Sequence, residues 1–273
     1  MAAEEAATIP RYPKVRARSV ALPVEHGSWG FLFEPLVAGI AVAPTITSVW
    51  IAILVVGAFL MRHPLKVILA GGKGKIGSPQ TALALKFLVI FAAVFCIGVV
   101  GTVLYARLES LVPFAIVLPF AAYQIYCDAT RSSRQLLAEM IGSVAISSSI
   151  AVIALAAAWD APKAYALWLI VIGRLIPSIL YVRNRLKLEK GKTYSQVIPI
   201  AAHVGAFATV LALAVYGVGL YLPVVMFVIL LARSVVGLSS YRKKVKAMKI
   251  GIWEVVYSTL TAVSIIVGYY AGF

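Results

Sequence analysis

The chain has 273 residues, of which 62% are hydrophobic and only 13% are charged. A soluble globular domain has roughly 45–50% apolar and about 25% charged residues, so this composition excludes one, and it also excludes a disordered chain, a coiled coil and a disulfide-rich scaffold. The 25 Lys and Arg against 10 Asp and Glu give a net charge of +15. In so apolar a chain this excess indicates cytoplasmic loops of a membrane protein, with the lipid bilayer rather than nucleic acid as partner.

Nine stretches are long and apolar enough for membrane-spanning helices, which need about 20 residues. They lie at 29–47, 48–65, 83–105, 111–127, 135–158, 164–183, 195–216, 218–238 and 251–272. The chain is therefore predicted to be an all-α, polytopic integral membrane bundle, with a cytoplasmic N-terminal tail at 1–22 and a single transmembrane domain at 23–273. The tail has no apolar run, so no cleavable signal peptide is expected. Cys96 and Cys127 fall in apolar stretches and are expected to be thiols without a disulfide or metal role.

The positive charges predict an orientation. With the N-terminus inside, 20 of the 25 Lys and Arg fall in the inside segments, and only Arg107 and Lys163 fall outside. Because Lys and Arg collect in cytoplasmic loops, this bias predicts the N-terminus inside and the C-terminus outside. The basic runs 183–192 and 242–249 are expected to set topology and contact the lipid surface. The chain is expected to be a multi-pass protein of the cell membrane.

Ionisable side chains inside apolar helices are costly, and they indicate a functional site by default. The candidate catalytic acids and bases are Glu25, His26, Asp128, Glu139, His203 and Glu254, and the candidate substrate-binding residues are Arg62, His63, Tyr126, Arg131, Arg174 and Arg233. Most lie near the helix ends assigned to the inside. Since a lone charge in hydrocarbon is expensive, they are expected to converge on one polar cavity open to the cytoplasm. No metal site is predicted, and the cofactor is left unassigned.

Helical spacing supports a shared lining, because residues three or four apart occupy one helix face. Four such stripes are Arg131, Gln135, Glu139, Gly142 and Ser143; Arg174, Ser178, Tyr181 and Arg185; Arg233, Gly237, Ser240 and Lys244; and Glu254, Tyr257, Ser258 and Thr261. Structural roles stay open for several candidates: His203 as a packing residue, Arg233 with Glu254 as an interhelical ion pair, and Glu25 with His26 as an interfacial pair. The Gly71–Lys75 loop lacks the spacing of a Walker A motif.

Two known families have similar features. Residues 23–30, Pro-Val-Glu-His-Gly-Ser-Trp-Gly, resemble the P-x-E-H-G-x-W-G signature of the YwiC-like family of membrane proteins. The segments 62–64, 128–131 with Glu139, 181–183 and 250–254 are similar to that family's other motifs. The family has no known function, so this resemblance implies a membrane protein without a mechanism.

A more distant, architectural resemblance is to the UbiA-type intramembrane prenyltransferases. It rests on nine helices, an inward polar cavity and the turn at 126–131, and it implies a prenyl diphosphate held through magnesium by two aspartate-rich motifs. At the corresponding places this chain has Arg-His-Pro-Leu-Lys at 62–66 and Arg-Asn-Arg-Leu-Lys at 183–187, neither with an aspartate. Cationic side chains are therefore expected to hold an anion directly.

Three functions stay open at this point. The first is a membrane-embedded enzyme that modifies a lipid or isoprenoid, binds its anionic group through arginines and uses the listed acids and histidines for proton transfer. The second is a transporter or permease of a small anion with a proton relay, and the third is a non-catalytic assembly protein. Alternating-access carriers usually have polar residues in both halves. The apolar outer halves and odd helix count of this chain favour the first function.

Overall fold

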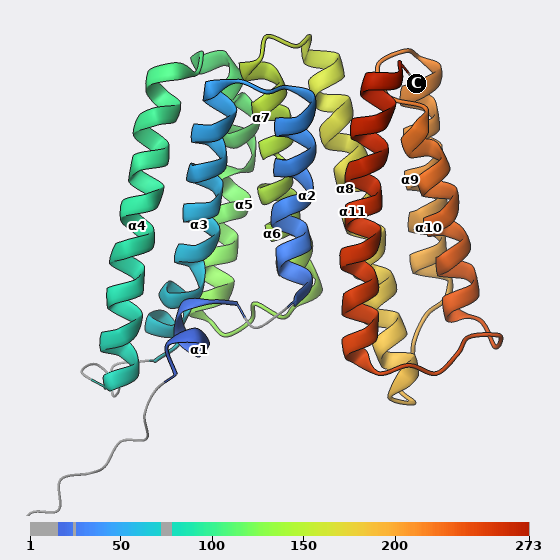
Figure 1. Cartoon of the computed structure of the whole chain (residues 1–273). Coiled ribbons are helices and arrows are strands. Elements are labelled where there is room, and N and C mark those ends of the chain that lie inside the picture. Colours follow the sequence, from blue (N-terminus) through green and yellow to red (C-terminus); the bar gives the residue numbers. More distant parts are fainter. Residues whose placement is uncertain (1–15, 24–25, 72–77, 273) are drawn as a thin grey trace, which may run out of the picture.

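The structure is a computed structural model that describes residues 16–23, 26–71 and 78–272, and every regular element in these ranges is a helix (Figure 1). In chain order they are α1 (Ala17–Ala21), α2 (His26–Val42), α3 (Ile46–Gly71), α4 (Pro79–Tyr105), the 3-10 helix η2 (Leu108–Leu111), α5 (Val112–Ala129), α6 (Leu136–Ser147), α7 (Ser149–Ala156), α8 (Ala161–Glu189), α9 (Val197–Val215), α10 (Leu222–Leu238) and α11 (Ala247–Ala271). The predicted all-α class is confirmed.

Seven helical segments in the described ranges are long and apolar enough to cross a membrane. Two further apolar helices, at Ser28–Val42 and Leu222–Leu238, are shorter. Side chains on the outer faces are apolar: on α4, for instance, Val89, Ile97 and Leu104 are all more than half exposed. Exposed apolar faces of this extent require lipid around the bundle, so the chain is a multi-pass membrane protein.

The helix boundaries differ from the predicted ones for local reasons. The stretch 135–158 is interrupted between α6 and α7, where the hydroxyls of Ser147, Ser148 and Ser149 donate hydrogen bonds to carbonyls three residues earlier. Such bonds compete with the helical ladder and bend helices. The helix expected at 164–183 continues to Glu189, and its last two turns are held by polar contacts that hydropathy does not detect.

Successive helices run up and down, so that their connections alternate between the two ends of the bundle (Figure 1). The turn between α5 and α6, the connection from α8 to α9 and the connection from α10 to α11 lie at the end where α1 lies. The basic runs 183–192 and 242–249 are therefore at one end, while Arg107 and Lys163 are at the other. We call these the basic end and the opposite end.

Close helix packing positions the walls of the site. Helices α3 and α4 lie against each other along their length, and a Cβ on Gly98 would collide with the backbone at Leu54. α11 packs on α2, and α8 packs on α6, α7 and α9. The short helix α1 lies in the predicted tail and packs on α3 and α4, burying Val20. The rest of the tail, residues 1–15, lies outside the described ranges.

Candidate functional site

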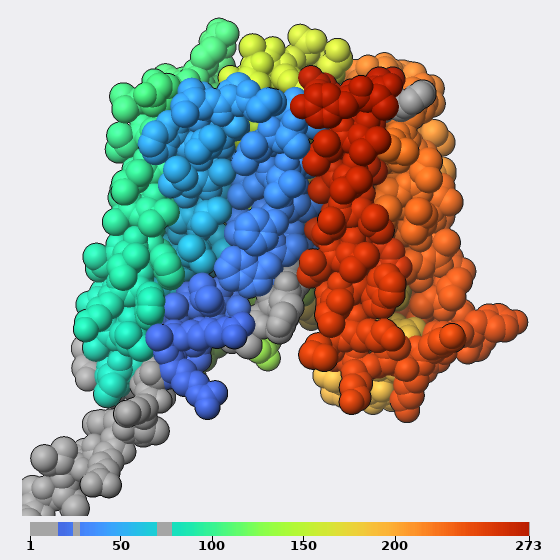
Figure 2. Space-filling view, in the orientation of Figure 1, coloured from blue at the N-terminus to red at the C-terminus, as the bar shows by residue number. Residues whose placement is uncertain are grey.

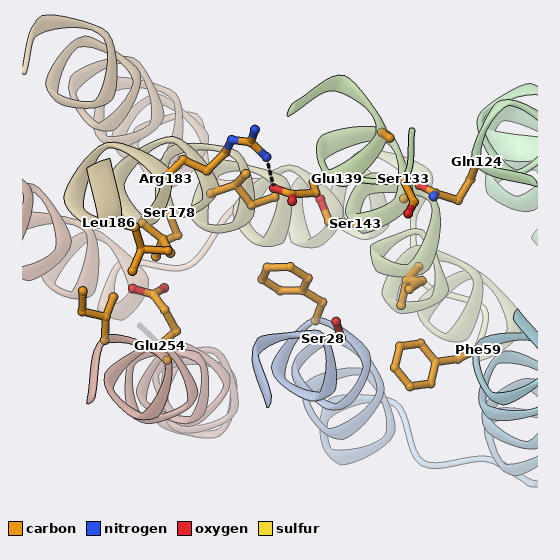
Figure 3. Close-up of a pocket in the computed structure, with 18 of the residues that line it drawn as sticks. Ser28, Phe59, Gln124, Ser133, Glu139, Ser143, Ser178, Arg183, Leu186 and Glu254 are labelled. Atoms are coloured by element: carbon orange, nitrogen blue, oxygen red, sulfur yellow. Dashed lines mark hydrogen bonds and ion pairs between the residues drawn. The ribbon is translucent and has the colours of Figure 1, made fainter. Parts of the chain in front are cut away.

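A cavity of about 510 Å³ lies among α2, α3, α5, α6, α8 and α11, towards the basic end of the bundle (Figure 3). Its ionisable lining residues are Arg62, Glu139, Arg183 and Glu254, and its polar ones include Ser28, Gln124, Ser133, Ser143 and Ser178. The remaining wall is mainly apolar, with Phe31, Phe59, Ile146, Ile179, Val182 and Leu186. Pockets of 300–1,000 Å³ with apolar walls and a few polar groups are typical of small-molecule sites.

A second cavity of about 240 Å³ adjoins the first, because Ser28, Phe59 and Arg62 line both. Its other lining residues are Pro23, His63, Lys66 and Arg134. The His63 ring nitrogen Nε2 lies 3.2 Å from the carbonyl oxygen of Ser19 in α1. Four of the residues that line this smaller cavity are therefore basic, namely Arg62, His63, Lys66 and Arg134.

Arg62 is fixed by a buried carboxylate. Its Nε and Nη2 donate to the two oxygens of Asp128, at 2.7 and 3.2 Å, and Asp128 is only 2% exposed. In the amide orientation that gives both polar atoms of Gln124 a partner, its nitrogen donates to the Ala138 carbonyl and its oxygen accepts from Arg62 Nη2 at 2.6 Å. Lys66 lies 4.0 Å from Asp128 and donates to Ser133 at 2.6 Å. Bidentate pairing holds the guanidinium in one orientation at the cavity wall.

Glu139 and Arg183 form an ion pair between two helices at the wall, with 2.7 Å between Oε2 and Nη1 (Figure 3). Both side chains are about one third exposed, at 36% and 33%. Glu139 lies in the first turn of α6, where the helix dipole favours a negative charge. The sequence placed Glu139 a full turn inside the helix, in the middle of a polar stripe that began at Arg131. That stripe starts only at Glu139, because Arg131 has a left-handed backbone (φ 58°) in the turn before α6.

A buried ion network stands behind the cavity. Arg174, which is 1% exposed, lies 3.4 Å from Glu34 Oε2 and 3.5 Å from Glu254 Oε2, and it donates to the Glu254 carbonyl at 2.7 Å. Arg233 donates to Glu254 Oε1 at 2.6 Å and to Ser178 at 3.2 Å. Ion pairs between two carboxylates and two guanidiniums thus connect α2, α8, α10 and α11. Glu254 belongs to both the network and the cavity wall.

Aromatic rings complete the surroundings of Arg233, whose guanidinium lies 4.4 Å from the ring centre of Tyr181 and 4.5 Å from that of Tyr257. His203 meets the Tyr181 ring edge-on, and its Nδ1 hydrogen-bonds the Pro199 carbonyl in the preceding turn. His203 is 3% exposed and is not among the cavity-lining residues. It lies in the packed wall behind the cavity.

The network ends against an apolar core on the side of the opposite end. Its members next to the network are fully or almost fully buried, and they include Leu36, Ile150, Ile153, Ile170, Val171 and Val210. They come from α2, α7, α8 and α9. In this conformation the cavity is therefore closed on that side by close-packed aliphatic side chains.

Residues 22–154 match the family model described as YwiC-like protein. No curated protein and no solved structure matches the chain. The resemblance inferred from the motifs is confirmed. Residues 22–154 form a YwiC-like segment. The resemblance to UbiA-type prenyltransferases stays a prediction from the sequence.

The YwiC-like segment holds α2 to α6 and most of α7, so it contributes Ser28, Arg62, Gln124 and Glu139 to the cavity. Arg183 and Glu254 come from α8 and α11, beyond the matched residues. The site therefore forms between the YwiC-like segment and the helices that follow it. Within the described ranges, no group of three or more His, Cys, Asp or Glu side chains is placed to hold a metal ion.

The predicted site residues fall into four groups. Arg62, Glu139 and Glu254 line the larger cavity and His63 lines the smaller one, while Asp128, Arg174, Arg233 and His203 stand behind the walls. Tyr126 is 63% exposed on α5 against Tyr123, and neither it nor Arg131 is among the lining residues. Glu25, the His26 side chain and most of the Gly71–Lys75 loop lie outside the described structure.

Glu34, Arg183 and Ser133 belong to the site or its supporting network but were not expected there. Glu34 was not among the candidate site residues, although a carboxylate at that depth indicates a buried partner. Arg183 was assigned to the basic topology run, yet it faces the cavity. Helical spacing had placed Ser143 and Ser178 in polar stripes, and Ser28 belongs to the motif at 23–30, whereas nothing in the sequence indicated Ser133.

Proposed function

We propose that this protein binds an amphiphilic molecule with an anionic group, a lipid or isoprenoid, in the cavity between the YwiC-like segment and α8 and α11. The observation that carries the proposal is a 510 Å³ chamber with mostly apolar walls and the guanidiniums of Arg62 and Arg183 on its surface. Arginine binds carboxylate and phosphate oxygens through two parallel hydrogen bonds. An apolar tail would pack against the side chains of Phe31, Ile179 and Leu186.

The same cavity supports an enzymatic role in a UbiA-like transfer reaction without aspartate-rich magnesium motifs. Glu139 and Glu254 are the two carboxylates on its wall and would move protons to and from the bound molecule. Asp128 and Arg174 would act only by holding Arg62 and Glu254 in place. The residue roles proposed here are therefore fewer than the sequence suggested.

Transport of a small anion is the second candidate. The network from Glu254 through Arg174 to Glu34 leads from the cavity into the core, as a proton relay would. The close-packed aliphatic core beyond Glu34 favours the first proposal, in which the ligand binds in the cavity and does not cross the bundle. Anion flux into proteoliposomes made with the purified protein would favour transport over the first proposal.

The binding proposal is tested by extracting lipids from the purified protein for mass spectrometry. Replacing Arg183→Gln removes one charged donor from the cavity wall, whereas Lys187→Gln removes an exposed charge one turn further along α8. A charge-assisted hydrogen bond contributes about 1.5–3 kcal/mol, so Arg183→Gln should lower retention of an anionic amphiphile about tenfold or more. Lys187→Gln should leave retention unchanged. Equal retention by both variants would place the ligand elsewhere.

We propose further that the basic end faces the cytoplasm in a cell membrane, and that α2 and α10 also span the bilayer to give nine crossings. The two short helices run parallel to the longer ones in the bundle (Figure 1). After Cys96, the exposed native thiol, is replaced, a cysteine at Lys163 should be labelled by an impermeant reagent from outside. Labelling from outside of a cysteine at Lys190 would refute the orientation.

A further inference from the structure

A separate groove lies at the start of α11, on the outer surface of the bundle. It encloses about 640 Å³ and is lined by Lys244, Val245, Lys246, Met248, Lys249, Ile252, Trp253 and Val256. These residues combine three ammonium groups with apolar side chains, and no acidic side chain is among them. The groove occurs where the basic connection from α10 enters α11, at the basic end (Figure 2).

The charges of this groove have no partner in the described part of the chain. No ion pair joins Lys244, Lys246 or Lys249 to a described acidic residue, whereas the nearby Arg242 lies 3.9 Å from Glu189. Three like charges gathered around one concavity repel each other, and an anion bound there would relieve this repulsion. The groove is therefore complementary to an anionic group that the described part of the chain does not supply.

An apolar surface leads away from the lysines along α11. Ile252, Val256, Leu260, Val263 and Val267 follow at helical spacing and are 38–52% exposed. The space-filling view shows α11 uncovered along its length (Figure 2). Trp253, which is 48% exposed, lines the groove and follows Ile252, the first residue of this stripe, and tryptophan prefers the level of the lipid headgroups.

We propose that this groove is a specific site for an anionic phospholipid, with the phosphate among the three lysines and an acyl chain along the exposed face of α11. Lysine binds phosphate as a point charge and tolerates several headgroup geometries. Clustered basic residues next to a membrane helix attract anionic lipids. Met248 lines both this groove and the internal cavity, but the three lysines and Trp253 line only the groove.

The test measures lipid retention by native mass spectrometry of the full chain with phosphatidylglycerol or phosphatidylcholine. The groove variant is the triple substitution Lys244→Gln, Lys246→Gln and Lys249→Gln, and its control is Lys187→Gln, Lys190→Gln and Lys192→Gln. Both triples remove three charges from the basic end, but only the first lies in the groove. Phosphatidylglycerol affinity should fall about tenfold or more in the groove variant and less than twofold in the control, since each lysine near an anionic surface contributes appreciably.

Four results would overturn the proposal. An equal loss in both triples, or equal binding of phosphatidylcholine, would mean general attraction rather than a site. Displacement of the lipid by millimolar inorganic phosphate, with soluble glycerophosphate binding as tightly as the lipid, would show that the stripe on α11 takes no part. A cross-link between two chains through a cysteine at Trp253 would assign the groove to a second copy of the protein.

Discussion

Replacing Arg174→Met tests whether the buried network holds the bundle together. The change removes the only guanidinium that lies within 4 Å of Glu34 among the described residues, and leaves that carboxylate buried at 3% exposure. Glu254 keeps its 2.6 Å contact with Arg233. Removing one partner of a buried ion pair costs about 3–5 kcal/mol, because the other charge stays uncompensated. We expect a loss of that size in the free energy of unfolding.

The double variant Glu34→Gln with Arg174→Met separates electrostatics from packing. It removes the orphaned carboxylate, so its stability should recover by about 2 kcal/mol relative to Arg174→Met alone, which is a clear coupling energy. Unfolding of the detergent-solubilised protein in SDS, followed by tryptophan fluorescence, measures both losses. Lys187→Ala, an exposed change on the same helix, should stay within about 0.5 kcal/mol of the wild type. Additive losses in the cycle, or a loss below about 1 kcal/mol for Arg174→Met, would refute the role of the network.

Two further predictions concern the walls of the site, measured in the same unfolding assay. Arg62→Ala should destabilise the protein by about 3 kcal/mol, since it removes the bidentate partner of the buried Asp128 and leaves only Lys66, 4.0 Å away, among the described cations. Arg183→Ala should cost less than about 1 kcal/mol, because its partner Glu139 is partly solvated; similar losses would contradict this ranking. Gly98→Leu should lower the free energy of unfolding by more than about 2 kcal/mol, because the side chain would separate α3 from α4. The control Gly205→Ala has open space around its Cβ and should be neutral or slightly stabilising. A tolerated Gly98→Leu would refute the close approach of the two helices.

Local composition was sufficient to predict the class of the protein. Apolar stretches of sufficient length require lipid whatever their partners, so the helical membrane bundle could be inferred before any contact was known. The motif at 23–30 was likewise sufficient for the family of residues 22–154. Helix ends were less predictable, because the break at the three serines and the extension of α8 to Glu189 depend on individual hydrogen bonds.

The candidate site was only partly accessible from the sequence. Helical spacing correctly grouped Arg174, Ser178, Tyr181 and Arg185 on one buried face of α8. Helical spacing did not show that Arg183 differs from the other basic residues of the run 183–192. The structure shows that it lines the cavity. A residue's depth in the membrane follows from its position in the stretch, but the direction in which it points depends on how its helix is rotated.

The sequence by itself determined that this protein is a helical membrane bundle with most of its basic residues at one end, because hydrophobic length and charge are properties of the chain alone. Only the tertiary structure decided which charge meets which. Glu34 and Glu254 are 220 residues apart in the chain and share Arg174. Tyr126 is only two residues from the cavity-lining Gln124, yet it faces outward. Such pairings depend on the rotation and close approach of helices, which follow from the packing of the whole bundle.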